Sequence, residues 1–157
     1  MNTPRILLSV LILAVLPSCS LSFKKTWKNA PGPTFGFSEK GCSTDYPPVC
    51  GRWEGTWLSA ANGHHGRLRA VVTEDGPSHA FHYHATWGGF LSGSFKAPHK
   101  VTKQKNGTYT FEGDHRMPDW AGGNYHYAGT IKGDDFSACY ESAKDKGTFT
   151  MKRVKQP

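Results

Sequence analysis

The sequence predicts an all-β protein, a single antiparallel up-and-down β-barrel of about eight short strands, preceded by a signal peptide and an irregular linker. From Gly51 onward, short runs of alternating apolar and polar residues are separated by glycine-bearing turns. The apolar residues fall on one face of every run, as a sheet closed around its own core requires. No sustained helical period appears. We therefore expect three segments, at residues 1–18, 19–50 and 51–154.

Residues 1–18 have the features of a signal peptide. Arg5 supplies a positive charge, and the apolar run from Ile6 to Leu16 is shorter than the roughly 20 apolar residues of a membrane span. The run ends at Leu16-Pro17-Ser18-Cys19, which resembles the lipobox of bacterial lipoproteins. That resemblance implies that Cys19 is acylated and anchors the protein in a membrane of the cell envelope. The alternative is ordinary cleavage after Ser20, which gives a secreted or periplasmic soluble protein.

The segment 19–50 has clustered lysine, proline and glycine residues and no sustained period, which predicts an irregular tether. Cys42 and Cys50 frame a stretch rich in turn residues that lets its ends meet. In an oxidising compartment we expect a disulfide between them. Cys139 is then the odd cysteine, and we expect a small buried apolar side chain there rather than a nucleophile.

Turn signals divide the barrel segment into eight strands. Asn62-Gly63 and Asn106-Gly107 are the strongest hairpin signals, and other glycine-bearing turns lie between the remaining runs. The strands are predicted at residues 52–59, 67–74, 79–86, 90–96, 108–113, 124–131, 136–141 and 147–153.

Alternation along these strands assigns their side chains to two faces of the sheet. The inward face takes apolar and aromatic residues: Trp53, Trp57, Leu68, Ala70, Val72, Phe81, Tyr83, Ala85, Tyr109, Phe111, Tyr125, Tyr127, Phe136, Ala138, Tyr140, Phe149 and Met151. The outward face takes charged residues and histidines: Glu54, Arg67, Arg69, His82, His84, Glu112, His126, Glu141 and Lys152. The barrel interior is therefore expected to be rich in aromatic rings.

Gly51-Arg52-Trp53 opens the first predicted strand, and Arg153 ends the last one with inward parity. This G-x-W at the start of a β-meander is similar to the signature of the lipocalin (calycin) superfamily. The resemblance implies a structural role in which Trp53 closes one barrel end and Arg153 packs across its ring, a contact worth roughly 0.5–2 kcal/mol. The wider pattern over residues 51–153 is similar to a family of uncharacterised secreted bacterial proteins.

The groups that resemble metal or acid–base sites are poorly placed for either chemistry. His82 and His84 lie on one predicted strand, whereas His126 lies on a strand that is not its neighbour in a meander. Asp114 and His115 are sequence neighbours on a strand end and point apart, and no nucleophile motif accompanies them. We therefore expect no catalytic residue, no metal site and no cofactor, and we predict that the protein is not an enzyme.

The charge balance indicates the class of partner. The formal net charge is +7 at pH 7, which favours anionic lipids or polymers. Nucleic acid is not expected, since no recognition motif accompanies the charge. These features, with the lipobox, indicate a membrane-anchored envelope lipoprotein.

Two main hypotheses describe what such a lipoprotein does. The leading one is non-catalytic binding of a small apolar or amphipathic ligand in the barrel, by Trp57, Phe81, Tyr83, Tyr125 and Tyr127. The alternative is a structural or interaction lipoprotein whose side chains fill the barrel. Its basic surface would contact anionic envelope polymers or lipids. A small hydrolase or lyase using His115 and Asp119 is a third hypothesis.

Overall fold

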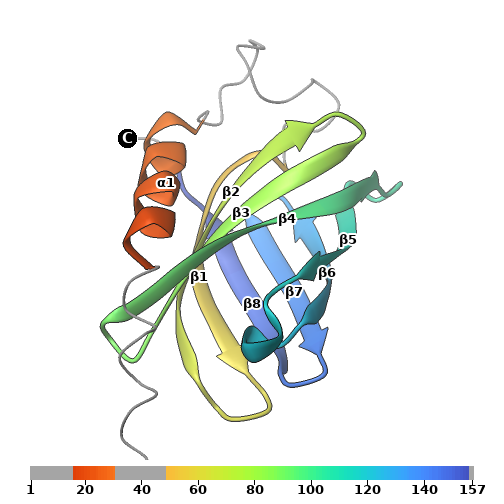
Figure 1. The fold of residues 1–157 in the computed structure, drawn as a ribbon. Coiled ribbons are helices and arrows are strands. Elements are labelled where there is room, and N and C mark those ends of the chain that lie inside the picture. Colours follow the sequence, from red (N-terminus) through yellow and green to blue (C-terminus); the bar gives the residue numbers. More distant parts are fainter. Residues whose placement is uncertain (1–15, 31–48, 156–157) are drawn as a thin grey trace, which may run out of the picture.

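The chain forms a closed antiparallel barrel in which eight strands follow one another in sequence order (Figure 1). A computed structural model describes residues 16–30 and 49–155, with side chains from Leu21 onward in the first of these ranges. The strands are β1 (Gly51–Ser59), β2 (His65–Asp75), β3 (Ser78–Trp87), β4 (Leu91–Lys103), β5 (Tyr109–Arg116), β6 (Asn124–Lys132), β7 (Asp135–Ser142) and β8 (Lys146–Arg153). The predicted fold class and each of the eight strands are confirmed.

The barrel closes where β1 pairs with β8. The register along this seam runs from Trp53 opposite Arg153 to Ser59 opposite Gly147. The β1–β2, β3–β4, β5–β6 and β7–β8 connections lie together at the lower end in Figure 1, and the fifth-to-sixth connection contains the short 3-10 helix η2 (Asp119–Ala121). Closure leaves no unpaired sheet edge, which is the hazard of an open sheet.

The core lies inside the barrel and consists of the predicted inward face. All the residues predicted to point inward are buried in one cluster or packed against it. The cluster also takes in residues outside that prediction, among them Ala97, Val101 and Ile131. Because side chains alternate along a strand, one apolar position in two is enough to fill the interior from all sides.

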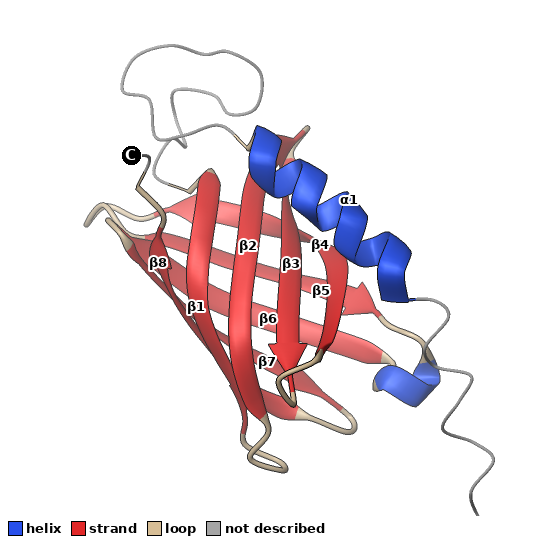
Figure 2. Cartoon of the chain, turned by 90° about the vertical axis from the view of Figure 1, so that its left-hand side faces the viewer, coloured by secondary structure: helices blue, strands red, loops and turns tan. Residues whose placement is uncertain are grey.

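A helix, α1 (Leu16–Asn29), lies across the outer wall of the barrel beside β3 and β4 (Figure 2). The prediction of an irregular tether is therefore wrong for residues 19–29. The helix is held by Phe23, which is 2% exposed, and by Trp27 one turn later. Among the described residues, no helix is both long and apolar enough to cross a bilayer. The rest of the predicted signal peptide and residues 31–48 of the predicted linker lie outside the described residues.

Strand β4 (Leu91–Lys103) extends well beyond the predicted residues 90–96. Pro98 lies within the extension, opposite Ala80 of β3. A proline normally demotes a strand because it has no N–H to donate to the ladder. The pairing between β4 and β5 begins just past Pro98, at Lys100 opposite Glu112. The N–H that Pro98 lacks is therefore not needed for pairing with β5.

The cysteines differ from expectation at one position. Cys139 is free and exposed on β7, with its side chain directed away from the core. The expectation of a buried apolar side chain there is wrong, because Cys139 has the opposite parity to the buried Ala138 and Tyr140. Cys50 is buried, but Cys42 lies outside the described residues, so their disulfide stays a prediction. Acylation of Cys19 also stays a prediction, since its side chain is outside the description.

Candidate functional site

The aromatic side chains predicted to bind a ligand meet inside the barrel and pack against one another. Phe81 and Tyr83 of β3 are fully buried, and Tyr127 of β6 is 2% exposed. The ring centroid of Tyr83 lies 6.0 Å from that of Phe81, 6.2 Å from that of Tyr127 and 5.5 Å from that of Phe149. These are contact distances for aromatic pairs. The centre of the barrel is therefore occupied by protein side chains.

The other two predicted ligand-binding residues lie at the margin of this cluster. Trp57 and Tyr125 are partly buried and pack against the core. The Trp57 indole N–H donates to the carbonyl of Thr86 at 3.0 Å, and the Tyr125 hydroxyl donates to the carbonyl of Ala121 at 3.0 Å. Both polar groups are thus satisfied by backbone rather than left for a ligand. A ligand role for the five aromatic residues stays a prediction.

A histidine that the sequence reasoning missed lies among these rings. His99 of β4 is 1% exposed, and its Nε2 lies 3.3 Å from the Tyr83 hydroxyl. Burial, followed by the charge of His115, lowers the pKa of His99 to about 4, so the ring is neutral at pH 7. Burial likewise raises the pKa of Tyr83 and Tyr127 above the usual range. The predicted strand ends at Lys96 and so does not include His99. Continued to Lys103, its period-2 alternation places His99 on the inward face.

At the other end of the barrel, the predicted contact between Trp53 and Arg153 is present. The Arg153 guanidinium carbon lies 4.2 Å from the centroid of the Trp53 ring. Arg153 also donates to the Cys50 carbonyl at 2.8 Å and pairs with Asp134 at 3.3 Å. The Trp53 indole N–H donates to the Val49 carbonyl at 3.0 Å. These contacts join the start of the first strand to the end of the last one, and they cover one end of the barrel. This arrangement fits a structural role.

The three outward histidines do not converge. His82 and His84 lie on β3, and β4 and β5 separate that strand from His126 on β6. His126 Nδ1 lies 2.9 Å from Asp114 Oδ1. Within the residues that the structure describes, no group of three or more histidine, cysteine, aspartate or glutamate side chains is placed to hold a metal ion.

The acid–base candidates near the lower end are likewise separated. Asp119 pairs with Arg116 at 3.0 Å, while the His115 ring stacks on Phe95 with centroids 5.7 Å apart. Asp114 faces outward toward His126. The structure therefore does not bring His115 and Asp119 together as a pair.

A polar row crosses the outside of the barrel on four adjacent strands. The register places Glu54 of β1 opposite Arg69 of β2, Arg69 opposite His84 of β3, and His84 opposite Ser94 of β4. His84 Nδ1 lies 2.7 Å from the Ser94 hydroxyl. Sequence reasoning placed Glu54, Arg69 and His84 on the outward face but could not align them, because the alignment depends on the register between strands.

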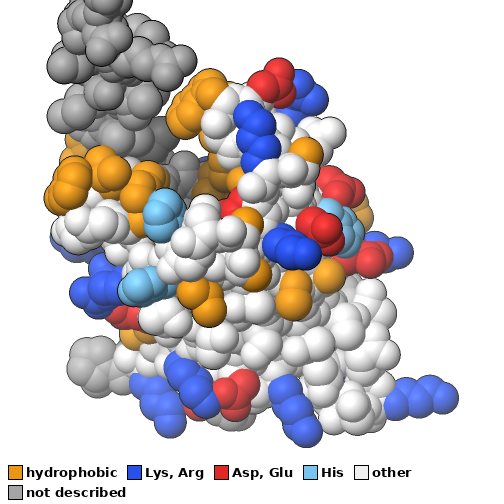
Figure 3. Space-filling model, turned by 90° about the horizontal axis from the view of Figure 1, so that it is seen from below, with side chains coloured by type: hydrophobic (Ala, Val, Ile, Leu, Met, Phe, Trp, Pro, Cys, Tyr) orange, Lys and Arg blue, Asp and Glu red, His pale blue; other side chains and the backbone are white. Residues whose placement is uncertain are grey.

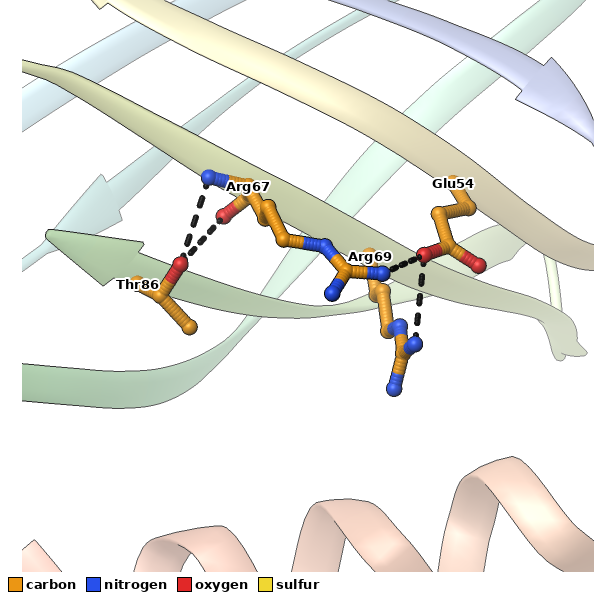
Figure 4. A network of polar contacts seen from close by, with 4 residues as sticks. All are labelled: Glu54, Arg67, Arg69 and Thr86. Carbon is orange, nitrogen blue, oxygen red and sulfur yellow. Dashed lines mark hydrogen bonds and ion pairs between the residues drawn. The ribbon is translucent and has the colours of Figure 1, made fainter. Parts of the chain in front are cut away.

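At Glu54, the first residue of this row, two arginines converge on one carboxylate oxygen. Arg67 and Arg69 both donate to Glu54 Oε1, at 2.5 and 3.1 Å (Figure 4). Burial acts to raise the pKa of Glu54, but the hydrogen bonds and charges of the two arginines outweigh it and lower the pKa. The Thr86 hydroxyl accepts from the Arg67 backbone N–H at 3.2 Å. Arg67, Arg69, His84 and Thr86 line a half-open pocket of about 90 Å³.

We call the outer face around α1 the α1 wall. Its helix carries basic side chains, and the Trp27 ring lies 5.1 Å from the Arg69 guanidinium and 5.8 Å from that of Arg52. Lys96 and Lys24 lie near enough to lower the pKa of His82 and His84, respectively, although burial is the larger cause for both. The wall comprises Lys24, Lys25, Lys28, Arg52, Glu54, Arg67, Arg69, His82, His84 and Lys96. Within this set the basic side chains far outnumber the acidic one.

The lower end of the barrel has a different surface. Viewed from below, acidic and basic side chains are interspersed with hydrophobic ones (Figure 3). Phe90 and Trp120, in the connections at this end, are 85% and 75% exposed. Acidic side chains thus belong to this lower surface, whereas Glu54 is the one acidic residue among those that define the α1 wall.

The fold and these contacts define an eight-stranded antiparallel barrel with a side-chain-filled centre, and this architecture is compatible with a lipocalin-like fold. Comparison with protein-family models, with curated proteins and with solved structures gives no match.

Proposed function

We propose that the protein is a lipid-anchored envelope lipoprotein whose filled barrel contacts anionic envelope polymers or lipids through its basic surface, without catalysis. The observation that carries this proposal is the α1 wall, where α1, with its lysines Lys24, Lys25 and Lys28, contacts Arg69 of β2 through Trp27. Arg67 and Arg69 share the single carboxylate of Glu54. Each basic residue near an anionic surface contributes about 1 kcal/mol of attraction. A lipid anchor at Cys19 would place this wall next to the membrane, because Cys19 lies within α1 itself.

The packing of the interior favours this function over ligand binding inside the barrel. The pockets of drug-sized ligands measure roughly 300–1,000 Å³. To open such a volume, the rings of Phe81, Tyr83 and Tyr127 would have to separate from contacts that keep them almost fully buried. Burial of each large aromatic side chain contributes about 2–3 kcal/mol, so the opened barrel would be costly. Binding of a small apolar or amphipathic ligand is therefore the competing hypothesis.

The proposed function is tested by vesicle co-sedimentation of the full chain carrying Cys19→Ser, which removes the acyl acceptor and leaves only the protein surface. We expect binding to vesicles that contain phosphatidylglycerol, no binding to pure phosphatidylcholine, and loss of binding as salt rises, because salt screens exposed charges. Lys25→Gln with Lys28→Gln should weaken binding by about thirtyfold, because two charges of about 1 kcal/mol each are removed. Lys103→Gln with Lys132→Gln removes the same charge from the ends of β4 and β6, outside the residues that define the α1 wall, and should weaken binding less.

An apolar fluorescent probe separates the two hypotheses. The filled barrel predicts no saturable uptake of the probe and no change in tryptophan emission. Saturable uptake that is lost on changing Tyr83 or Tyr127, together with indifference to anionic vesicles, would replace the proposed function with the competing one.

A further inference from the structure

The pocket on the α1 wall is a small site walled by cationic and polar side chains. Arg67, Arg69, His84 and Thr86 line it, and its volume of about 90 Å³ is well below that of a drug-sized ligand pocket. It has room for several water molecules, each of which needs about 10–15 Å³ on the same measure. A compact tetrahedral oxyanion is a group of that size.

The two arginines are fixed in position but are not saturated by Glu54. Each donates through one terminal nitrogen to the same oxygen of Glu54, whose single charge balances only one of the two guanidinium charges. A guanidinium carries five N–H donors, so both arginines keep donors for a second acceptor. Arginine pairs are well suited to phosphate because their planar fork matches its oxygens in bidentate geometry.

His84 completes the site from the neighbouring strand. Its ring is held between Ser94, which contacts Nδ1 at 2.7 Å, and Phe23 of α1, which stacks on it with centroids 4.8 Å apart. Nε2 is the nitrogen that these contacts leave for a ligand. Burial, and then the charges of Arg69 and Lys24, lower the pKa of His84, which indicates a positive potential at the ring. A bound anion would reverse the electrostatic part of that shift.

We propose that this pocket binds a phosphate group, with Arg67 and Arg69 as the main donors, and that the group belongs to the headgroup of an anionic lipid. The inference rests on the proposed function and specifies its ligand. It favours a lipid because Cys19 and Phe23 are one helical turn apart on α1, about 6 Å along the helix axis. Acyl chains on Cys19 would therefore bring the membrane surface to the side of the pocket.

The first measurement is an NMR titration of the full chain carrying Cys19→Ser with inorganic phosphate, with chloride as the comparison at equal ionic strength. We expect phosphate, and not chloride, to shift the His84 imidazole resonances and to raise the pKa of His84. The charged groups that act on His84 are Arg69 of β2 and Lys24 of α1, and both favour its neutral form until an anion binds.

The matched variants are Arg67→Gln and Arg116→Gln. Both arginines are exposed to a similar degree, 67% and 68%, and each is paired with one carboxylate, so the two variants remove the same charge and the same kind of ion pair. Arg67→Gln should weaken phosphate binding about tenfold, because it removes a charged hydrogen-bond donor from the pocket. Arg116→Gln should leave it unchanged. The same two variants are then compared on phosphatidylglycerol vesicles.

Four outcomes separate this inference from the proposed function. Loss of both phosphate and vesicle binding in Arg67→Gln alone supports the headgroup site. Loss of phosphate binding with normal vesicle binding overturns the lipid assignment, because the pocket then takes free phosphate. Vesicle binding to which both variants respond equally, with no phosphate titration, overturns the pocket and leaves the proposed function standing. Failure to bind either probe overturns both.

Discussion

The buried histidine His99 links the chemistry of single residues to the stability of the barrel. It packs between Phe81, with ring centroids 4.5 Å apart, and the Tyr83 hydroxyl. Burial is the first cause that lowers its pKa to about 4, against 6.5 for an ordinary histidine. The folded state therefore holds His99 neutral, whereas the unfolded chain takes up a proton near pH 6.5.

This difference predicts that the protein loses stability in mild acid. Because the folded pKa is the lower one, the contribution of His99 is fully present above pH 6.5 and is lost as the pH falls toward 4. The loss amounts to about 1.4 kcal/mol for each pH unit in that window. His82, whose pKa burial also lowers to about 4, adds to the slope. Urea unfolding at pH 7, 6, 5 and 4 measures how the free energy of unfolding changes with pH. That free energy should fall less steeply with decreasing pH for His99→Gln than for the unchanged chain.

Arg153 gives a second prediction at the scale of one side chain. Arg153→Met keeps the apolar stem but removes the guanidinium that lies over Trp53 and donates to the Cys50 carbonyl. We expect the free energy of unfolding to fall by about 2–3 kcal/mol, since a cation–π contact and a charged hydrogen bond are lost together. Lys155→Met removes a cation that is 81% exposed and 3.6 Å from the same Asp134. Chemical denaturation should find that control within about 0.5 kcal/mol of the unchanged chain.

At the scale of elements, the helix α1 depends on one buried side chain. Phe23 lies 5.0 Å from the His82 ring and 4.8 Å from the His84 ring, centroid to centroid, and fixes the helix on β3. Phe23→Ala should release α1 while the barrel stays folded, because the strand pairing that closes the barrel does not involve the helix. Hydrogen exchange should then show fast exchange of the α1 amides with protected strands.

The same variant has a second readout at His82. Removal of the helix should expose the ring and raise its pKa from about 4 toward the ordinary value, which NMR titration measures. Lys25→Ala, at an exposed position of the same helix, should change neither the exchange nor the pKa. If Phe23→Ala leaves the α1 amides protected, the helix is held by other contacts.

The strands could be predicted from the sequence because their signal is local, and the helix could not. Alternation with period 2 is visible within a single strand, so Phe81 and Tyr83 were assigned to the core correctly. Among the α1 side chains that the structure describes, from Leu21 onward, Phe23 and Trp27 mark the packed face, and two residues one turn apart do not make a measurable helical period. The extension of β4 was missed because Pro98 is a local signal against a strand, and the barrel places it where no ladder donor is needed.

At the scale of the whole molecule, the candidate pocket needed information that no single strand holds. Glu54, Arg69 and His84 were each assigned outward from their own strands, but the row that joins them depends on the register of three strand pairs. The stacking of Phe23 on His84 depends in addition on where α1 lies against the barrel. Sequence patterns thus placed Arg67, Arg69 and His84 on the outer face but did not predict a site there, because their alignment in space is a property of the closed barrel.

Barrel closure itself rests on small residues at the β1–β8 seam, and this gives the final prediction. Gly55 lies opposite Met151, and a Cβ at Gly55 would fall 2.0 Å from the Thr150 carbonyl oxygen and 2.6 Å from the Met151 Cα. These are backbone atoms that cannot rotate away, so Gly55→Ala must separate the two strands. We expect the free energy of unfolding to fall by about 3 kcal/mol.

The control for the seam is a glycine of similar strand position whose neighbour can move. A Cβ at Gly93 of β4 would meet only side-chain atoms of Trp87, the nearer at 3.3 Å, so Gly93→Ala should stay within about 1 kcal/mol of the unchanged chain. Hydrogen exchange locates the effect. In Gly55→Ala the amides of β1 and β8 should lose protection before those of β3 and β4, since opening begins at the seam. Equal loss of protection in all strands would show that Gly55→Ala does not open the β1–β8 pairing first. The stability of the closed barrel would then be shared by all eight strand pairings.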